Sequence, residues 1–292
     1  MAERRREGAR ALPAIARALG VRRCRSELLP YLRGTVDDED EGILLAVAES
    51  LQECVPFFGD NVEGYLPEVL GILEALAGVE EEVVRNAATK GAANILDYVY
   101  KMANKVDKEA GLQVAVAFGD MCGRLGRKEW FTARMSASAL YPKVLERCVQ
   151  GSGLDEHIRI FSTLCRDDIP MVRRIASKHL GPFLASVVRL QGPEVALSRS
   201  VPSVLLPLYE ELGGDDQDSV RLQTTENAIA FARVLGKYGE AAWGLVRSRV
   251  LPLLVRAVDD RSWRVRWTVA SKYGAACQAL SGGGAQATGS GG

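Results

Sequence analysis

The chain has 292 residues, 47% of them hydrophobic, and its 37 basic side chains balance 37 acidic ones. This balance excludes a global field that would draw the chain to nucleic acid or to an anionic membrane, so other proteins are the expected partners. No apolar stretch reaches the roughly 18 residues of a membrane span, and Arg17 interrupts the apolar part of the N-terminus, which predicts an intracellular chain without a signal peptide.

Five segments share one helical template. Apolar or small residues recur four, eight, eleven and fifteen positions after a first apolar residue, which is the spacing of one face of an α-helix. In chain order the template residues are Val84, Ala88, Ala92, Ile95 and Val99; Ala133, Ala137, Tyr141, Val144 and Cys148; Val172, Ala176, Leu180, Phe183 and Val187; Val220, Thr224, Ala228, Phe231 and Leu235; and Val265, Val269, Tyr273, Ala276 and Leu280.

The segments between these helices are also apolar at helical spacing, so each unit is predicted to be an antiparallel helix pair. They include residues 62–77, 154–166, 200–213 and 243–258. Proline near the start of several first helices suits either a first turn or a bend. These prolines are Pro30, Pro67, Pro207 and Pro252. One pair cannot bury its own inner face, so neighbouring pairs must stack on it.

An arginine marks the start of each template helix. These are Arg85, Arg134, Arg173, Arg221 and Arg266, which are 49, 39, 48 and 45 residues apart. Repeats of this length indicate stacked helical hairpins. The uneven spacing predicts that some connections between repeats are longer. We also expect Gly119, Gly123 and Gly126 to loosen the helix before Trp130, and Pro142 to end or kink the helix after it.

The chain contains few candidates for catalysis. It has two histidines, and His179 is predicted to be a partly exposed residue in the middle of a helix. Its six cysteines are scattered singly, which predicts buried free thiols and no zinc site. No phosphate-binding glycine loop, GxSxG or HExxH motif occurs, so neither enzymatic activity nor a cofactor is expected.

Several phrases resemble the HEAT-repeat scaffold subunits of protein phosphatase 2A, in that family's order. They include "GVEEEVVRNAA" (78–88), "WFTARMSA" (130–137), "CRDDIPMVRRIASKHLG" (165–181), "DDQDSVRL" (215–222) and "DDRSWRVRWTVASK" (259–272). The matches cover about residues 5–280. The resemblance implies an all-α HEAT-repeat solenoid, a right-handed superhelix of antiparallel helix pairs, whose turns within each pair form a ridge.

The resemblance also implies a domain plan and a set of partners. Residues 1–280 would form about six and a half repeats, beginning at the second helix of the first, and the Gly/Ser-rich residues 281–292 are predicted to be a disordered tail. In this family the N-terminal ridge holds a regulatory (B-type) subunit. The catalytic subunit would be bound only if the missing C-terminal repeats were supplied. The implied location is the cytoplasm, and secondarily the nucleus.

Two groups of site residues follow. The first is an inter-repeat ladder, in which each aspartate precedes its arginine by six positions: Asp167 with Arg173, Asp215 with Arg221 and Asp260 with Arg266. Val79 takes the place of the aspartate before Arg85, and Lys128 takes it before Arg134. The second group is the partner-binding surface that the resemblance implies. It comprises Glu81, Glu82, Trp130, Asp168, Pro170, Arg174, Asp216, Asp218, Trp263 and Arg264.

Two other function classes fit the fold. A generic adaptor in transport or assembly would explain the helix pairs but not the phosphatase-type phrases. A HEAT-like enzyme, such as a DNA glycosylase or a bilin lyase, would need a basic concave stripe or catalytic side chains that the sequence does not supply. The sequence also predicts that the last template helix presents Val269, Tyr273 or neighbouring apolar atoms to water.

Overall fold

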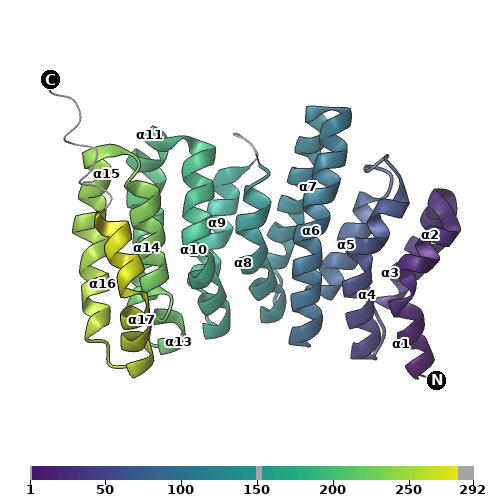
Figure 1. The fold of residues 1–292 in the computed structure, drawn as a ribbon, viewed down its shortest axis with the longest axis horizontal. Helices are drawn as coiled ribbons and strands as arrows, with labels where there is room; N and C mark the ends of the chain where they lie inside the picture. Colours follow the sequence, from purple (N-terminus) through teal and green to yellow (C-terminus); the bar gives the residue numbers. More distant parts are fainter. Residues whose placement is uncertain (1, 149–152, 282–292) are drawn as a thin grey trace. The chain divides into compact units, whose positions relative to one another are not determined.

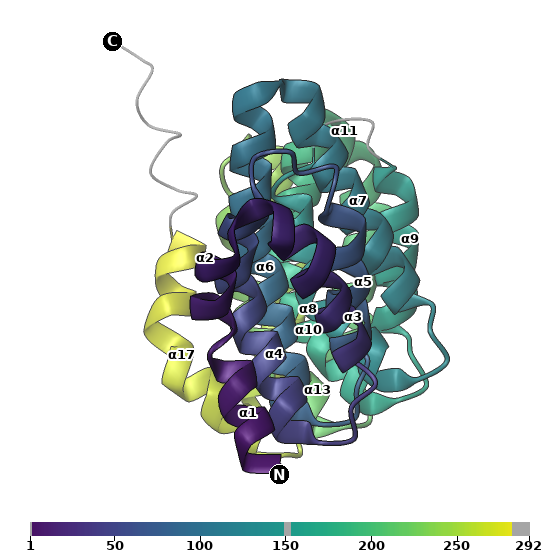
Figure 2. The same ribbon diagram turned by 90° about the vertical axis from the view of Figure 1, so that its right-hand side faces the viewer.

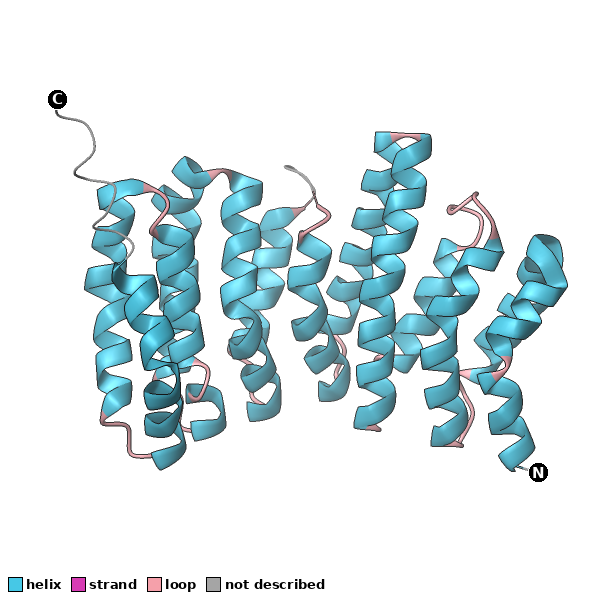
Figure 3. Ribbon diagram, in the orientation of Figure 1, coloured by secondary structure: helices cyan, strands magenta, loops and turns pink. Residues whose placement is uncertain are grey.

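The computed structural model describes residues 2–148 and 153–281. Every regular element in these two ranges is a helix, so the predicted all-α class of helix pairs is confirmed (Figure 3). The chain divides into two compact units, Met1–Ser152 and Gly153–Gly292. Residues 282–292, which make up nearly all of the tail predicted to be disordered, lie outside the described residues.

The first unit stacks its helices in two layers (Figures 1 and 2). One layer holds α4, α6 and α8, and the other holds α3, α5 and α7. The bounds are α1 Ala2–Arg10, α2 Leu12–Arg23, the π-helical turn η1 Cys24–Leu28, α3 Leu29–Thr35, α4 Glu41–Cys54, the 3-10 turn η2 Val55–Phe58, α5 Leu66–Leu76, α6 Glu82–Val106, α7 Lys108–Gly126 and α8 Phe131–Leu145.

The second unit repeats this two-layer plan. In one layer α14 packs between α10 and α17, and in the other α12 lies beside α9 and η4. The bounds are α9 Leu154–Cys165, α10 Pro170–Gln191, α11 Pro193–Val195, the π-helical stretch η3 Ala196–Leu205, α12 Leu206–Gly213, α13 Asp218–Arg221, α14 Thr224–Leu235, α15 Gly239–Leu245, the π-helical turn η4 Val246–Val250, α16 Leu251–Val258 and α17 Trp263–Ser281.

The template residues form the core of both units. All of them are buried except Tyr273 and Leu280, so the predicted inner face is confirmed for four of the five helices. In α17, Tyr273 is 68% exposed, as the prediction for this last helix had it, but Val269 is 7% exposed and therefore buried. Tyr273 is exposed because α17 has a neighbouring helix in its layer on one side only, α14, whereas α14 itself lies between α10 and α17.

The extra residues between the marker arginines are helical. Only Asp107 separates α6, which has 25 residues, from α7, and only Gly192 separates α10, which has 22 residues, from α11. The expectation of longer connections between repeats is therefore wrong, because the added length extends helices whose apolar faces remain buried.

The helices on either side of Trp130 are more regular than the sequence predicted. The helix α7 runs unbroken through Gly119, Gly123 and Gly126, which lie on its buried face. The helix α8 continues to Leu145, three residues past Pro142, and keeps helical backbone angles throughout. Pro142 therefore lies in the last turn, where its missing amide hydrogen removes one bond to the carbonyl four residues earlier without ending the helix at once.

Three of the four prolines near the first helices lie just after a π-helical turn. Pro30, Pro207 and Pro252 each follow a π-helical segment without a break in the helix. The residue before each proline donates its amide to the carbonyl five positions back, as Leu29 does to Cys24. Because proline has no amide hydrogen, a wider turn at this point is the local response. Pro67, by contrast, lies in a true first turn.

Candidate functional site

The turns between the two helices of each pair are the candidate site, and an arginine closes five of them in the described residues. In each case Nη1 of the guanidinium donates to the carbonyl oxygens six and five positions earlier. Arg173 contacts Asp167 O at 2.7 Å and Asp168 O at 3.2 Å, and Arg221 repeats this with Asp215 and Asp216. The other three turns are closed in the same way, by Arg85, Arg134 and Arg266. These bonds satisfy main-chain carbonyls of the turn itself, a few residues beyond the end of the first helix.

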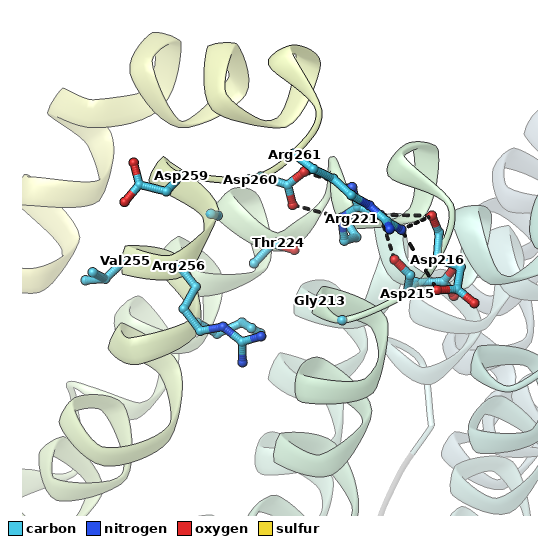
Figure 4. Close-up of a pocket in the computed structure, with 13 residues that line it drawn as sticks. Gly213, Asp215, Asp216, Arg221, Thr224, Val255, Arg256, Asp259, Asp260 and Arg261 are labelled. Atoms are coloured by element: carbon cyan, nitrogen blue, oxygen red, sulfur yellow. Dashed lines mark hydrogen bonds and ion pairs between the residues drawn. The ribbon is translucent and has the colours of Figure 1, made fainter.

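Arg173 and Arg221 also reach the next repeat. Arg173 donates from Nε to Asp215 Oδ2 at 2.6 Å and from Nη2 to Asp215 Oδ1 at 3.1 Å. Arg221 binds Asp260 in the same bidentate way, with both distances at 2.8 Å (Figure 4). The bond from Arg221 lowers the pKa of the Asp260 carboxyl, so the pair stays charged at neutral pH. Planar fork-to-fork contacts of this kind fix orientation as well as adding energy.

Each ladder aspartate also shapes its own turn. Asp167, Asp215 and Asp260 accept a bond from the backbone amide two residues later, at 2.8 to 2.9 Å. Arg173 and Arg221 therefore each contact two aspartates. Each guanidinium binds the main-chain carbonyl of the aspartate in its own turn and the side-chain carboxylate of the aspartate in the following turn. In the first unit Val79 and Lys128 occupy the aspartate positions, yet Arg85 and Arg134 still close their turns.

The predicted partner-binding residues of the second unit lie mostly on the surface. Asp168 and Arg174 are exposed and Pro170 is half-buried. Trp263, the first residue of α17, is 67% exposed. Its neighbour Arg264 lies 3.6 Å from Asp218 Oδ2, which also accepts a bond from Ser262.

Asp216 and Asp218 therefore have contacts within the chain. Arg261 reaches back to Asp216, donating to its carbonyl oxygen at 2.8 Å, with its guanidinium 3.9 Å from the carboxylate. The Asp216 side chain remains 98% exposed and Asp218 is half-buried. Both carboxylates are thus surface groups that help join adjacent turns, a role that the sequence did not indicate.

A charged hollow of about 540 Å³ lies beside these turns (Figure 4). It opens between the end of α12 and the end of α16, and Arg221 and Thr224 form part of its wall. The sequence interpretation missed three charged residues in its lining: Arg256, Asp259 and Arg261. With acidic and basic groups intermixed, the hollow suits a polar or charged side chain of a partner protein better than an apolar ligand.

In the first unit the predicted residues are split between exposed and partly covered positions. Glu82 is exposed and Glu81 is half-buried at the start of α6. Trp130, at the start of α8, is 51% exposed, and its ring lies 5.8 Å from that of Phe131. Trp130 thus packs one side on its neighbour and presents the other to solvent.

Exposed apolar residues near these positions went unnoticed in the sequence. Trp267 is 64% exposed, four residues after Trp263 and hence on the same side of α17, and Met171 is 48% exposed beside Pro170. The four-residue spacing of Trp263 and Trp267 in the sequence would have predicted that both lie on the same side of the helix. Aromatic side chains contribute large contact areas at interfaces.

The other candidate chemistries have no support in the described residues. They contain no group of three or more potential metal ligands and no helix long and apolar enough to cross a membrane. All six cysteines are free thiols; five are buried, but Cys277 is exposed, contrary to the prediction for it. Burial raises the pKa of the Cys54 thiol to about 12, which makes it a poor nucleophile.

His179 is half-buried in the middle of α10, as predicted. Burial, with a smaller effect of Lys178, lowers the pKa of His179 to about 4. A group with this pKa is neutral at physiological pH, and protonating it favours the unfolded chain.

Acidification should therefore destabilise the protein through His179. The unfolded chain binds this proton at pH values below about 6.5, whereas the folded chain binds it only near about pH 4. The free energy of unfolding should fall by about 2 kcal/mol between pH 7 and pH 4.5. Urea denaturation of wild type and His179→Gln at both pH values measures this. The difference between the two proteins should change with pH, and a constant difference would contradict the assignment.

Several relatives with curated names match the chain, including the following three. The A-type regulatory subunit of protein phosphatase PP2A from Schizosaccharomyces pombe is 34% identical over 262 residues, covering 90% of this chain and 40% of the relative. A probable PP2A regulatory subunit of Caenorhabditis elegans is 41% identical over 78% of the chain and 35% of the relative. The beta isoform of the human A-type 65 kDa regulatory subunit of phosphatase 2A is 39% identical over 62% of the chain and 28% of the relative.

These matches agree with the resemblance seen in the sequence phrases, and the chain spans 40% or less of the length of these three relatives. No family model matches the chain. Among solved structures, the karyopherin Kap121p aligns with 93% of this chain and 25% of its own, with a TM-score of 0.57 and 14% identity, which supports the fold alone.

Proposed function

Because the chain is homologous to the A-type regulatory subunits of PP2A over most of its length, we propose that it is a non-enzymatic scaffold that binds phosphatase regulatory subunits of the B type along its turns. The relatives are named regulatory subunits, in agreement with the predicted absence of catalytic activity. Since the chain spans 40% or less of their length, we propose contact with the catalytic subunit only when the remaining repeats are supplied.

The observation that carries this proposal is the exposure of Trp263 beside turns that are already rigid. An interface residue contributes most when its support does not have to be ordered on binding. The ladder bond from Arg221 to Asp260 and the closure of the turn by Arg266 supply that support within three residues of Trp263. Tryptophan and arginine are also the residue types that most often dominate binding energy.

The neighbouring charges support a polar partner surface. Asp168 and Arg174 are exposed on one turn, and the charged hollow beside Asp216 lies on the next. Mixed charges of this kind orient a partner and speed its association more than they raise affinity. The apolar contact would then come from Trp263 and Trp267.

Binding of a purified B-type regulatory subunit tests the proposal. Trp263→Ala and Arg174→Ala should each weaken binding by about 30-fold, which corresponds to the 2 kcal/mol of a typical hot spot. Isothermal titration calorimetry on the full chain measures the dissociation constants.

Two residues at the opposite edge of the helix pairs serve as controls. Tyr238 is 37% exposed and Lys237 is exposed at the connection between α14 and α15. Tyr238→Ala and Lys237→Ala should leave binding within about twofold of wild type. If Trp263→Ala and Arg174→Ala also stay within about twofold, the turns are not the binding surface.

A further inference from the structure

An apolar groove of about 560 Å³ lies in the first unit, at the edge opposite the turns. It runs between the loop that follows η2 and the connection from α6 to α7. Val62, Leu66 and Pro67 come from the loop and α5, Ala103 and Val106 from the last turns of α6, and Ala110, Gln113, Val114 and Ala117 from α7. Its volume falls within the roughly 300–1,000 Å³ of protein sites that bind ligands.

The loop wall of the groove is held in place by Arg25. Its guanidinium donates from Nε to Phe58 O at 2.6 Å and from Nη2 to Asn61 O at 2.8 Å, and it lies 5.4 Å from the ring centre of Tyr65. Asn61 in turn accepts a bond from the amide of Gly64 at 3.3 Å. These contacts tie the loop to η1, which carries Arg25.

The helical wall is equally fixed. The chain passes from α6 to α7 through Asp107 alone, and Gly111 packs so closely that a Cβ there would lie 3.0 Å from Asn104 Cβ. This tight crossing holds the ends of the two helices together. A groove with two rigid walls is pre-formed, which reduces the entropic cost of binding.

The lining defines the chemistry of an occupant. Small apolar residues of α6 and α7 line one side, and Val106 is 77% exposed at its edge. The charged groups among the described lining residues are Asp60 and Glu63, both acidic and both exposed. An occupant should therefore carry a bulky apolar side chain next to a cationic one.

The length of the groove indicates how much of a partner it accepts. Ala110 and Ala117 are seven residues apart on α7, which is roughly 10 Å of helix. An extended chain covers the same distance in about three residues. A short peptide segment fits this dimension.

We propose that this groove binds a short extended segment of a partner protein in which a large apolar residue is flanked by lysine or arginine. The segment lays its apolar side chain over Ala110, Val114 and Ala117, and its cationic neighbours face Asp60 and Glu63. The groove and the turns lie at opposite ends of α6, so this binding is independent of the proposed scaffold function.

Fluorescence anisotropy with defined probes tests the proposal on the full chain. The probes are fluorescein-labelled nine-residue peptides with Leu, Ile, Met, Phe or Trp at the centre, Lys on both sides and Gly-Ser ends. At least one of them should bind, and should do so at least tenfold more tightly than its counterparts with Glu flanks or a central Ala. If none binds, or if the Glu-flanked peptide binds equally well, the proposal is wrong.

Variants locate the binding. Ala110→Phe fills the groove and should weaken binding of the best probe at least tenfold, whereas Glu109→Phe, at an exposed neighbour that does not line the groove, should leave it within twofold. Glu63→Lys should weaken binding at least fivefold and Glu109→Lys should not. Glu63 is exposed, so its replacement tests the site even if Ala110→Phe fails to fold. Equal binding by Glu63→Lys and wild type would overturn the proposal.

Discussion

Replacing Arg221 with alanine should lower the free energy of unfolding of the second unit by about 3 kcal/mol. The side chain is 5% exposed and makes four bonds: two to the Asp260 carboxylate and two that close its own turn. Its loss would leave Asp260, whose side chain is 12% exposed, without its cation. Urea denaturation followed by circular dichroism measures the change, and hydrogen exchange should show reduced protection in α13–α17.

Arg266 is the matched control for this change. It closes its own turn with the same two bonds, but no ion pair to a carboxylate joins it in the described residues, and it is exposed. Arg266→Ala should therefore cost only about 1 kcal/mol, and the difference between the two variants isolates the inter-repeat bond. Equal effects of the two variants would mean that the Asp260 pair adds nothing to stability.

Phe183→Ala should destabilise the second unit by about 3–5 kcal/mol. The ring of Phe183 stacks on that of Phe161, with the centres 3.9 Å apart and the planes 8° from parallel, and both side chains are fully buried between α9 and α10. Truncation would remove this contact and leave a cavity that the two helices cannot close. Thermal and urea denaturation measure the loss.

Two further variants separate packing from helix propensity. Met171→Ala lies on the same helix at a 48% exposed position and should change stability by less than about 0.5 kcal/mol. Phe183→Leu keeps most of the volume and should cost less than half as much as Phe183→Ala. A small effect of Phe183→Ala would contradict the view that stacked helix pairs are stabilised mainly by this shared inner face.

The inner faces of the helices could be predicted from sequence because burial follows a fixed helical period. Val172, Leu180 and Phe183 lie where the template placed them. Tyr273 satisfies the same period but is exposed, because periodicity tells which side of a helix is apolar and not whether another helix covers it. Covering depends on the neighbouring pair, which the local pattern does not contain.

The distribution of the extra residues could not be predicted. The distance of 49 residues from Arg85 to Arg134 is compatible with a long loop or with long helices. The structure places the excess in α6 and α7, joined by Asp107. The π-helical turns before Pro30, Pro207 and Pro252 could not be predicted for a similar reason. Proline is equally compatible with a first turn and with a π-helical bulge.

The candidate site was also predictable in part. The positions of Trp263 and Arg174 on exposed turns followed from the helix starts, which the sequence marks clearly. The pairing of Asp218 with Ser262 and Arg264 depends on how two turns lie next to each other. The groove beside Glu63 was also not visible, because it depends on how one loop and the helices α5, α6 and α7 pack against one another.

Closure of five turns by an arginine has a consequence for how such a surface can evolve. The bonds from Arg221 go to main-chain oxygens of residues 215 and 216, and main-chain oxygens are present whatever the side chains are. Turns with valine or lysine at the ladder position are closed equally well. Side chains that point outward from these turns can therefore mutate freely while the backbone keeps its shape, so descendants of one scaffold can acquire new recognition without losing their architecture.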